Sequence, residues 1–173
     1  MKIFKLGFTL AEVMIAVAIV GIVASITMPV LMTNFTKDAN LNLYKKFVND
    51  LDHAVYLMKA ENYRGDFDSS RLGKTNSQVK EFIEDYLKMK KDCGASPTNC
   101  FASSYKSFNH SFSGGYGAQI KNGVSVYIIP KSSTSNAKAY VDVNGKKGPN
   151  VYEKDLFTVN ICDDFSARVD ACE

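Results

Sequence analysis

Residues 5–32 read KLGFTLAEVMIAVAIVGIVASITMPVLM, a short basic leader followed by a long apolar run. Glu12 is the one charged residue between Phe8 and Met32, and only small polar side chains interrupt the run elsewhere. As an α-helix these 25 residues would measure about 37 Å, more than the roughly 30 Å of a bilayer's hydrocarbon core. The run therefore predicts one membrane-spanning helix over residues 8–32.

The helical pattern continues beyond the apolar run. Pro29 removes one backbone hydrogen bond near the outer end, so we expect a bend there without an end to the helix. Between residues 44 and 58 the apolar side chains recur at helical spacing, and polar side chains, His53 among them, take the opposite face. We interpret His53 as a solvated side chain rather than a ligand or a base. The apolar positions are Tyr44, Phe47, Val48, Leu51, Val55 and Met58.

The remainder of the sequence predicts a small domain of mixed structure. Turn residues indicate a loop over residues 61–73, and a second helix is expected from a cap at Asn76 or Ser77 to about Lys91. Turn-rich surface loops are expected at residues 93–100 and 103–117. About four antiparallel strands follow, at residues 117–121, 124–130, 137–143 and 156–161, with a hairpin turn at Asn122-Gly123. The expected fold is α+β, a long N-terminal helix packed on a small antiparallel β-sheet.

Four cysteines, Cys93, Cys100, Cys162 and Cys172, form two close pairs in the second half of the chain. An even number of cysteines in a chain with an export signal favours disulfides, because a zinc site would need closer cysteine spacing or nearby histidines. Three pairings are possible. We favour Cys93 with Cys100 and Cys162 with Cys172, which close the shortest loops, and we expect an oxidising compartment.

Composition argues against several classes of function. The chain has 173 residues, enough for one domain. Of its 21 basic residues, Lys2 and Lys5 lie in the leader, so the rest of the chain has 19 basic and 18 acidic residues. A near-neutral body is not the footprint of a nucleic-acid-binding protein. The sequence contains no G-x-S-x-G or H-E-x-x-H motif and no cysteine with an assigned histidine. We therefore expect no enzymatic activity.

The segment from Lys5 to Glu12 resembles the signature of type IV prepilins and type II secretion pseudopilins. In that family a basic leader ends in glycine, here Gly7, and a glutamate lies five residues into the helix that follows. The resemblance implies that a membrane peptidase cuts between Gly7 and Phe8 and methylates the new N-terminus. It extends to Pro29, at a position where members commonly carry a helix-bending proline, and to the layout of the whole chain, which would be pilin-like. Ala11 departs from the larger aliphatic residue that is usual, but alanine is also apolar and helix-forming.

Glu12 is a functional candidate on physical grounds as well. A carboxylate at the centre of a bilayer costs about 2.5–3.5 kcal/mol on insertion scales, and less toward the interface, so such residues are functional by default. The sequence has no Lys or Arg between residues 8 and 32, but cleavage would create a cation, the free amine of Phe8. That amine could come from the same chain or from a neighbouring subunit, and we expect Glu12 to carry assembly.

These readings divide the chain into a leader at 1–7, a transmembrane and assembly helix at 8–32 and an extracytoplasmic pilin-like domain at 33–173. The protein would lie in a bacterial inner membrane as a single-pass protein, with its N-terminus and leader lysines in the cytoplasm. It would later form a periplasmic or cell-surface filament. The resemblance implies as partners copies of itself and other pilins, a prepilin peptidase, an inner-membrane platform protein and an assembly ATPase, and no nucleic acid unless it is a competence pilin.

Several alternatives stay open. A minor pilin at a filament tip could bind DNA or an adhesion target through the aromatic-rich loop Tyr105 to Tyr116. A membrane-anchored domain that never polymerises, including an uncleaved signal anchor, is a further possibility. Ala16-Val17-Ala18 has the form of a signal-peptidase site, although the apolar run continues well beyond it and the leader is too short. The sequence does not distinguish a type IV pilus from a secretion pseudopilus or a competence pilus.

The stretch DVNGKKGPN, with an acidic residue downstream, offers a candidate metal site. Asp142, Asn144, Asn150 and Asp155 supply oxygen ligands on an expected loop between two strands. The EF-hand pattern fails, since lysines replace a ligand and the turn glycine. The stretch is similar to one that recurs in the C-terminal sheets of pilin-like proteins, and major pseudopilins bind calcium in a loop of that region. A plain turn is the favoured interpretation and calcium the alternative; no other cofactor is expected.

Overall fold

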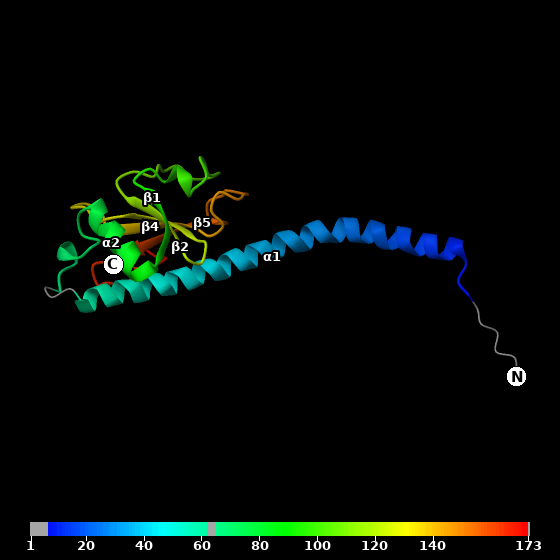
Figure 1. Cartoon of the computed structure of the whole chain (residues 1–173), viewed down its shortest axis with the longest axis horizontal. Helices are drawn as coiled ribbons and strands as arrows, with labels where there is room; N and C mark the ends of the chain where they lie inside the picture. The colour runs from blue at the N-terminus through cyan, green and yellow to red at the C-terminus, as the bar shows by residue number, and fades with distance from the viewer. Residues whose placement is uncertain (1–6, 62–64, 173) are drawn as a thin grey trace, which may run out of the picture. The chain divides into compact units, whose positions relative to one another are not determined.

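The computed structural model describes residues 7–61 and 65–172 (Figure 1). Most of the expected leader, including Lys2 and Lys5, lies outside the described residues. The chain divides into two compact units, the first ending at Ala39 and the second beginning at Asn40. Both units contain part of one long helix, α1 (Leu10–Glu61), because the helical pattern runs without a break across the boundary.

The first unit consists of the N-terminal part of α1, whose large apolar side chains are exposed within it. Among the described residues α1 is the one helix long and apolar enough to cross a membrane. The helix continues through Pro29, as expected, because a proline removes one hydrogen bond from the ladder while the flanking bonds persist.

The second unit is α+β, as predicted. After α1 come a 3₁₀ turn η1 (Phe67–Ser69) and α2 (Asn76–Leu87), and a second 3₁₀ turn η2 (Pro97–Asn99) follows the first strand. Within the described residues, six antiparallel strands form one sheet in chain order, each paired with the next. They are β1 (Met89–Gly94), β2 (Tyr116–Ile120), β3 (Ser125–Ile129), β4 (Ala137–Asp142), β5 (Leu156–Ile161) and β6 (Ala167–Arg168).

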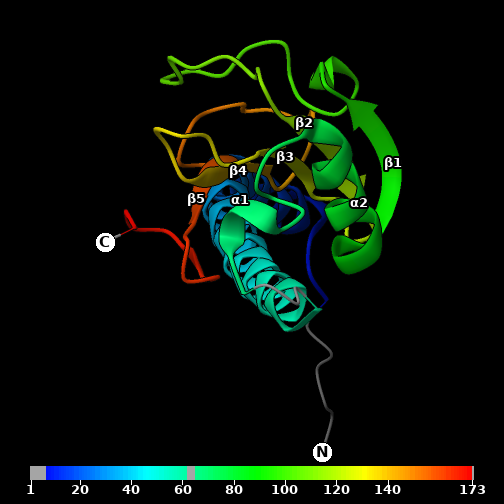
Figure 2. The same ribbon diagram turned by 90° about the vertical axis from the view of Figure 1, so that its left-hand side faces the viewer.

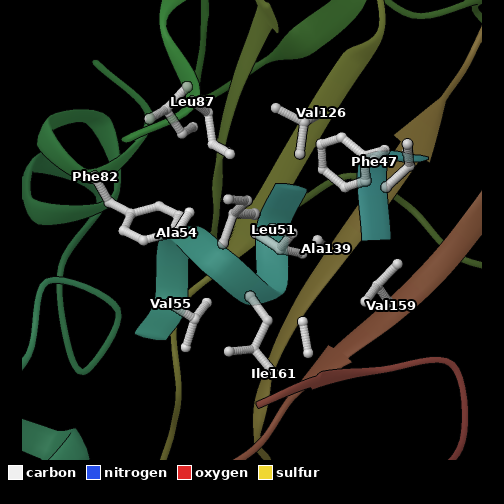
Figure 3. Close-up of a cluster of buried hydrophobic side chains, with 14 of the residues drawn as sticks. Phe47, Leu51, Ala54, Val55, Phe82, Leu87, Val126, Ala139, Val159 and Ile161 are labelled. Atoms are coloured by element: carbon white, nitrogen blue, oxygen red, sulfur yellow. The ribbon is translucent and has the colours of Figure 1, made fainter. Parts of the chain in front are cut away.

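The two faces of the sheet carry different clusters of side chains. On one face, α1 from Tyr44 to Met58 and α2 pack on the strands; Phe47 and Leu51 of α1 lie against Val126 of β3 (Figure 3). On the other face, Tyr127 and Tyr140 pack with side chains from the loops. Figure 2, which looks along α1, shows the helix on one side of β3, β4 and β5 and the green loop before β2 on the other. The period of two along β3 produces this separation.

Three sequence predictions were wrong in detail. The second helix was expected to reach about Lys91, but α2 ends at Leu87, because Lys88 takes a left-handed conformation with φ 56°. The cap is Thr75, whose hydroxyl accepts a hydrogen bond from the Gln78 amide at 3.4 Å, and not Asn76 or Ser77. About four strands were expected, and the described residues contain six. The strand β1 lacks the alternation of apolar and polar residues that predicts a strand, because it lies at the edge of the sheet and is mostly exposed. Charged residues are common in edge strands of natural sheets.

Candidate functional site

The start of α1 is organised by a reciprocal pair of hydrogen bonds between Thr9 and Glu12. One carboxylate oxygen of Glu12 accepts from the Thr9 amide and from the Thr9 hydroxyl, both at 2.8 Å, and the Glu12 amide donates to that hydroxyl at 3.3 Å. This is a capping box, which satisfies amides that have no partner inside the helix. It holds the Glu12 carboxylate at the first turn of α1. Thr9 was not among the predicted site residues, although the pattern T-x-x-E at residues 9–12 is the sequence signature of a capping box.

The residues that flank the expected cleavage site lie outside the helix. Gly7 and Phe8 precede the first residue of α1 and have no regular secondary structure. Phe8 is 87% exposed. A peptide bond in this setting can enter a protease site without first unwinding a helix, and the free amine made by cleavage would lie next to the capping box.

The family comparison addresses this N-terminal region. Residues 5–28 match the family model of the prokaryotic N-terminal methylation motif. The chain carries a prepilin-type cleavage and methylation signal. No curated protein and no solved structure matches the chain. The matched residues include Gly7, Phe8 and Glu12, and end one residue before Pro29.

The prepilin-type signal has consequences for processing and location. It implies cleavage by a prepilin peptidase and supports a protein that is like a type IV pilin or a pseudopilin. With the apolar first part of α1, it is consistent with a membrane-anchored pilin.

Two disulfides are present in the second unit. Cys93 at the end of β1 is bonded to Cys100 next to η2, and Cys162 after β5 is bonded to Cys172. These are the pairs that close the shortest loops. The described residues contain no free cysteine.

The second disulfide closes a C-terminal loop that lies against α1. The Asp52 carboxylate accepts a hydrogen bond from the Ala167 amide at 2.8 Å. The Lys59 ammonium donates to the Asp164 carbonyl at 3.4 Å and lies 5.4 Å from the centre of the Phe165 ring. The polar face of α1 thus holds the end of the chain. His53, on the same face, is exposed as expected.

The four candidate metal ligands lie at and between the ends of β4 and β5. Asp142 and Asp155 are both fully buried. The Asp155 carboxylate accepts hydrogen bonds from the Asn150 and Val151 amides, both at 2.6 Å, and the Asp142 carboxylate accepts one from the Asn144 amide at 3.0 Å. Each carboxylate oxygen has a second lone pair that these bonds do not use.

Two side-chain oxygens in this loop have no hydrogen-bond partner. Over the described part of the chain, the buried side-chain polar atoms without a partner are the amide oxygens of Asn144 and Asn150. An unpaired buried acceptor costs about 1–3 kcal/mol, so such atoms are rare in folded proteins. Both belong to the set of residues that the sequence predicts as calcium ligands, and calcium takes six to eight oxygen ligands of these kinds.

Burial changes the ionisation of one carboxylate in the loop. Burial raises the pKa of Asp142 to about 7; the charge of Asp155 adds to the rise, and hydrogen bonds from Tyr105 and Asn144 oppose it. A positive charge beside a buried carboxylate favours its ionised form. The described residues hold no group of three or more His, Cys, Asp or Glu side chains placed for a metal. Amide and backbone oxygens would therefore have to complete the ligand set.

The aromatic loop that the sequence offers as a contact surface is largely packed on the sheet. Tyr105 is buried, and Phe108 and Phe112 are half-buried against a cluster that includes Tyr127 and Tyr140. Phe112 lies 5.3 Å from Tyr127 and 5.7 Å from Tyr140, measured between ring centres. Most of this aromatic surface is thus used inside the domain.

Proposed function

We propose that the chain is a structural subunit, a pilin, minor pilin or pseudopilin, of a type IV pilus or type II secretion filament. The observation that carries the proposal is a single carboxylate, Glu12, in an apolar run that begins directly after a prepilin-type cleavage site. Outside a membrane the exposed apolar side chains of this run need another cover. Copies of the same helix can cover these side chains, because removing apolar surface from water is favourable and does not depend on direction.

The ion pair gives this assembly a register. Cleavage after Gly7 creates an amine at Phe8, and methylation leaves that amine basic. A neighbouring subunit's amine can pair with Glu12 only when the two helices lie at one axial offset. In a low-dielectric bundle an unpaired charge is costly, so a wrong offset is disfavoured. A platform protein and an assembly ATPase, which the family resemblance implies, would deliver the subunit.

Substitutions at Glu12 test the proposal. When the variant is the sole subunit of its kind, Glu12→Ala should be cleaved and reach the membrane but form few or no filaments. Glu12→Gln keeps an oxygen that can accept from Thr9, so it should fail nearly as badly if the charge is what matters. Thr9→Ala is the matched control, because it removes the hydroxyl of the capping box and keeps the charge of Glu12. Filaments of normal number and length with Glu12→Ala would overturn the proposal.

Two alternatives are separated by simple observations. A minor tip pilin would be scarce relative to another pilin in sheared filaments, and gold-labelled antibody would mark filament ends rather than their length. A membrane-anchored domain that never polymerises would be absent from filaments, and an uncleaved anchor would keep its leader.

We propose calcium binding in the loop between β4 and β5 as a second function. The observation that favours it is that the amide oxygens of Asn144 and Asn150 have no hydrogen-bond partner, in a stretch of chain bounded by the buried carboxylates of Asp142 and Asp155. Thermal melts of the mature chain in detergent, with millimolar calcium or with chelator, test it. Calcium should raise the melting temperature, because a ligand that binds only the folded state stabilises it. Asp155→Asn should remove the shift, and Asp164→Asn, an exposed carboxylate, should keep it. An unchanged melting temperature in the unsubstituted chain would return the loop to a plain turn.

A further inference from the structure

The loop between η2 and β2 contains a tripeptide of the kind that accepts N-linked sugars. It is Asn109-His110-Ser111, and the form Asn-x-Ser or Asn-x-Thr, with any residue except proline in the middle, is the acceptor signal for N-linked glycans in exported proteins. The sequence holds one other example, at residues 34–36. Short motifs of this kind also occur by chance, so the local structure at each tripeptide decides which of the two can react.

Asn109 and Ser111 lie in a part of the loop that has no regular structure. Residues 108–113 belong to no helix, strand or turn, and Asn109 and Ser111 are both exposed. Within residues 7–61 and 65–172, neither of them has a hydrogen-bond partner for its backbone or its side chain. The tripeptide can therefore adopt the local turn that brings the asparagine amide beside the residue two positions on, because no existing bond has to break.

The other tripeptide, Asn34-Phe35-Thr36, is closed to such a turn. It lies inside α1, where the backbone amides and carbonyls bond to each other along the helix. The Thr36 hydroxyl donates to the Met32 carbonyl at 2.8 Å. A turn at this place would have to break both the helix and this bond. The structure thus distinguishes two tripeptides that the sequence motif treats as equal.

The location of Asn109 also suits the modification. Asn109 belongs to the second unit, and so do both disulfides, Cys93–Cys100 and Cys162–Cys172. Disulfides persist in oxidising compartments outside the cytoplasm, which is also where a surface asparagine of an exported protein receives its sugar. The disulfides and the glycan therefore require the same compartment.

The side chains next to Asn109 surround a hollow of about 350 Å³ on the face of the sheet opposite α1 (Figure 2). A volume of this size is in the range of small-molecule sites. A sugar ring has C–H groups on its faces, which can pack on aromatic rings, and hydroxyls at its edges, which serine hydroxyls can bond. The hollow offers both kinds of group. Its lining includes Phe101, Phe108, Phe112, Ser103, Ser104 and Ser111.

We propose that Asn109 is the acceptor of an N-linked glycan whose first sugar lies in this hollow. The donor is a sugar carried on a lipid diphosphate. The side-chain nitrogen of Asn109 forms a bond to C1 of the sugar, and the bond from C1 to the diphosphate oxygen breaks. The lipid diphosphate leaves with the electron pair, and one amide proton passes to a base of the transferase. The proposal requires export of the second unit and does not depend on filament assembly.

The consequence concerns the rings that the sheet does not fully cover. Phe108 and Phe112 are half-buried against the cluster on this face. A sugar in the hollow would cover more of both rings and present a polar surface in their place.

Mass spectrometry of the full chain, extracted from cells of its own organism, tests the proposal. Trypsin cuts after Lys106 and after Lys121 and releases residues 107–121 as one peptide. This peptide should carry the added mass of a glycan. Enzymatic release of an N-linked glycan leaves aspartate in place of asparagine, which identifies Asn109 as the attachment point. Asn34 should be unmodified in the same sample.

Variants of the tripeptide test the requirement for each residue. Asn109→Gln and Ser111→Ala should each lose the glycan completely, and Ser111→Thr should retain it, because threonine also satisfies the signal. Thr36→Ala is the matched control, since it destroys the tripeptide inside α1, and it should leave the glycan in place. The two residues changed at 109 and 111 have no bonding partners in the described chain, so these variants should fold as the unsubstituted chain does.

The outcomes that would overturn the proposal are distinct. An unmodified peptide 107–121 from the unsubstituted chain would show that Asn109 is not an acceptor. A glycan that remains in Asn109→Gln would lie on a serine instead. Hydrogen exchange tests the position of the first sugar, because residues 101–112 should exchange severalfold more slowly in the unsubstituted chain than in Asn109→Gln, while β4 should be unchanged. Equal rates over residues 101–112 would mean that the sugar lies outside the hollow.

Discussion

Glu12 serves two partners in turn. In the single chain its carboxylate caps the first turn of α1 through Thr9. On the proposed function, the same carboxylate would meet an amine at Phe8 after cleavage, of its own chain or of a neighbour. A capping bond is worth about 1 kcal/mol, less than a charge pair shielded from water, so the cap can orient the carboxylate without preventing assembly.

The mature chain should begin at Phe8. Gly7 and Phe8 lie before the helix within the matched signal, and the expected product carries one methyl group on its new amine. Intact-mass analysis of protein extracted from membranes checks both features. A mature N-terminus at Met1 would exclude cleavage, and one at Ile19 would indicate ordinary signal peptidase.

Tyr44 should make stability depend on pH in the alkaline range. Its hydroxyl donates to the Thr158 carbonyl at 3.0 Å, and burial raises its pKa to about 12, with smaller contributions from Tyr152 and Asp170. The folded state thus favours the neutral phenol, whose contribution is complete below the unfolded pKa of about 10 and is lost as pH rises through 12.

Tyr44→Phe should lower the free energy of unfolding by about 1 kcal/mol at neutral pH and flatten the loss between pH 10 and 12. Denaturant titrations across this range measure both effects. Tyr56→Phe is the control, because Tyr56 lies on the same helix and is 64% exposed. Equal alkaline slopes for the Tyr44 variant and the unsubstituted chain would contradict this account.

At the scale of the element, α1 is one helix in two environments, and its C-terminal part stabilises the domain. Leu51 is fully buried, and Leu57, six residues further along α1 on another face, is 40% exposed. Leu51→Ala should cost about 2–5 kcal/mol, the usual effect of an emptied core position. Leu57→Ala should cost well under that. Chemical denaturation of both variants checks the contrast; similar losses would mean that the face turned to the sheet is wrong.

The two disulfides should be recoverable by peptide mapping without reduction, as Cys93 with Cys100 and Cys162 with Cys172. Replacing the second pair with serine should cost up to about 3 kcal/mol on the loop-entropy model and loosen the C-terminal loop from Asp52 and Lys59. Exchange rates at Ala167 measure the loosening. A linkage between Cys93 and Cys172 would contradict the pairing.

At the scale of the whole molecule, folding and assembly should be separable. Glu12 lies in the first unit, and the core of the second begins at Tyr44. Glu12→Ala should therefore leave the melting temperature of the domain unchanged while filaments are lost. Calorimetry of the purified variant, alongside filament counts, checks this. A lowered melting temperature would mean that lost filaments reflect poor folding.

The periodic parts of the molecule were the predictable parts. The apolar run, the face from Tyr44 to Met58 and the strands around Asn122-Gly123 follow one period each, and they fold as expected. The strand β1 could not be predicted in this way. Its lysines and Asp92 fit a strand at the edge of a sheet, and that position is known only from the fold. The same holds for Asn144 and Asn150: their spacing marks possible ligands, but only burial shows that their oxygens lack partners.

The order of the strands affects how the domain can be completed. Each strand pairs with its neighbour in sequence, so the contacts within the sheet are local in the chain, which favours fast folding. The contact of α1 with β5 is different: Tyr44 stacks on Phe157, 4.2 Å between ring centres, across most of the chain. If the second unit crosses a membrane in chain order, the apolar face of α1 would stay uncovered until β5 had followed. Export would then have to outrun aggregation over that interval, which the docking of β5 would end.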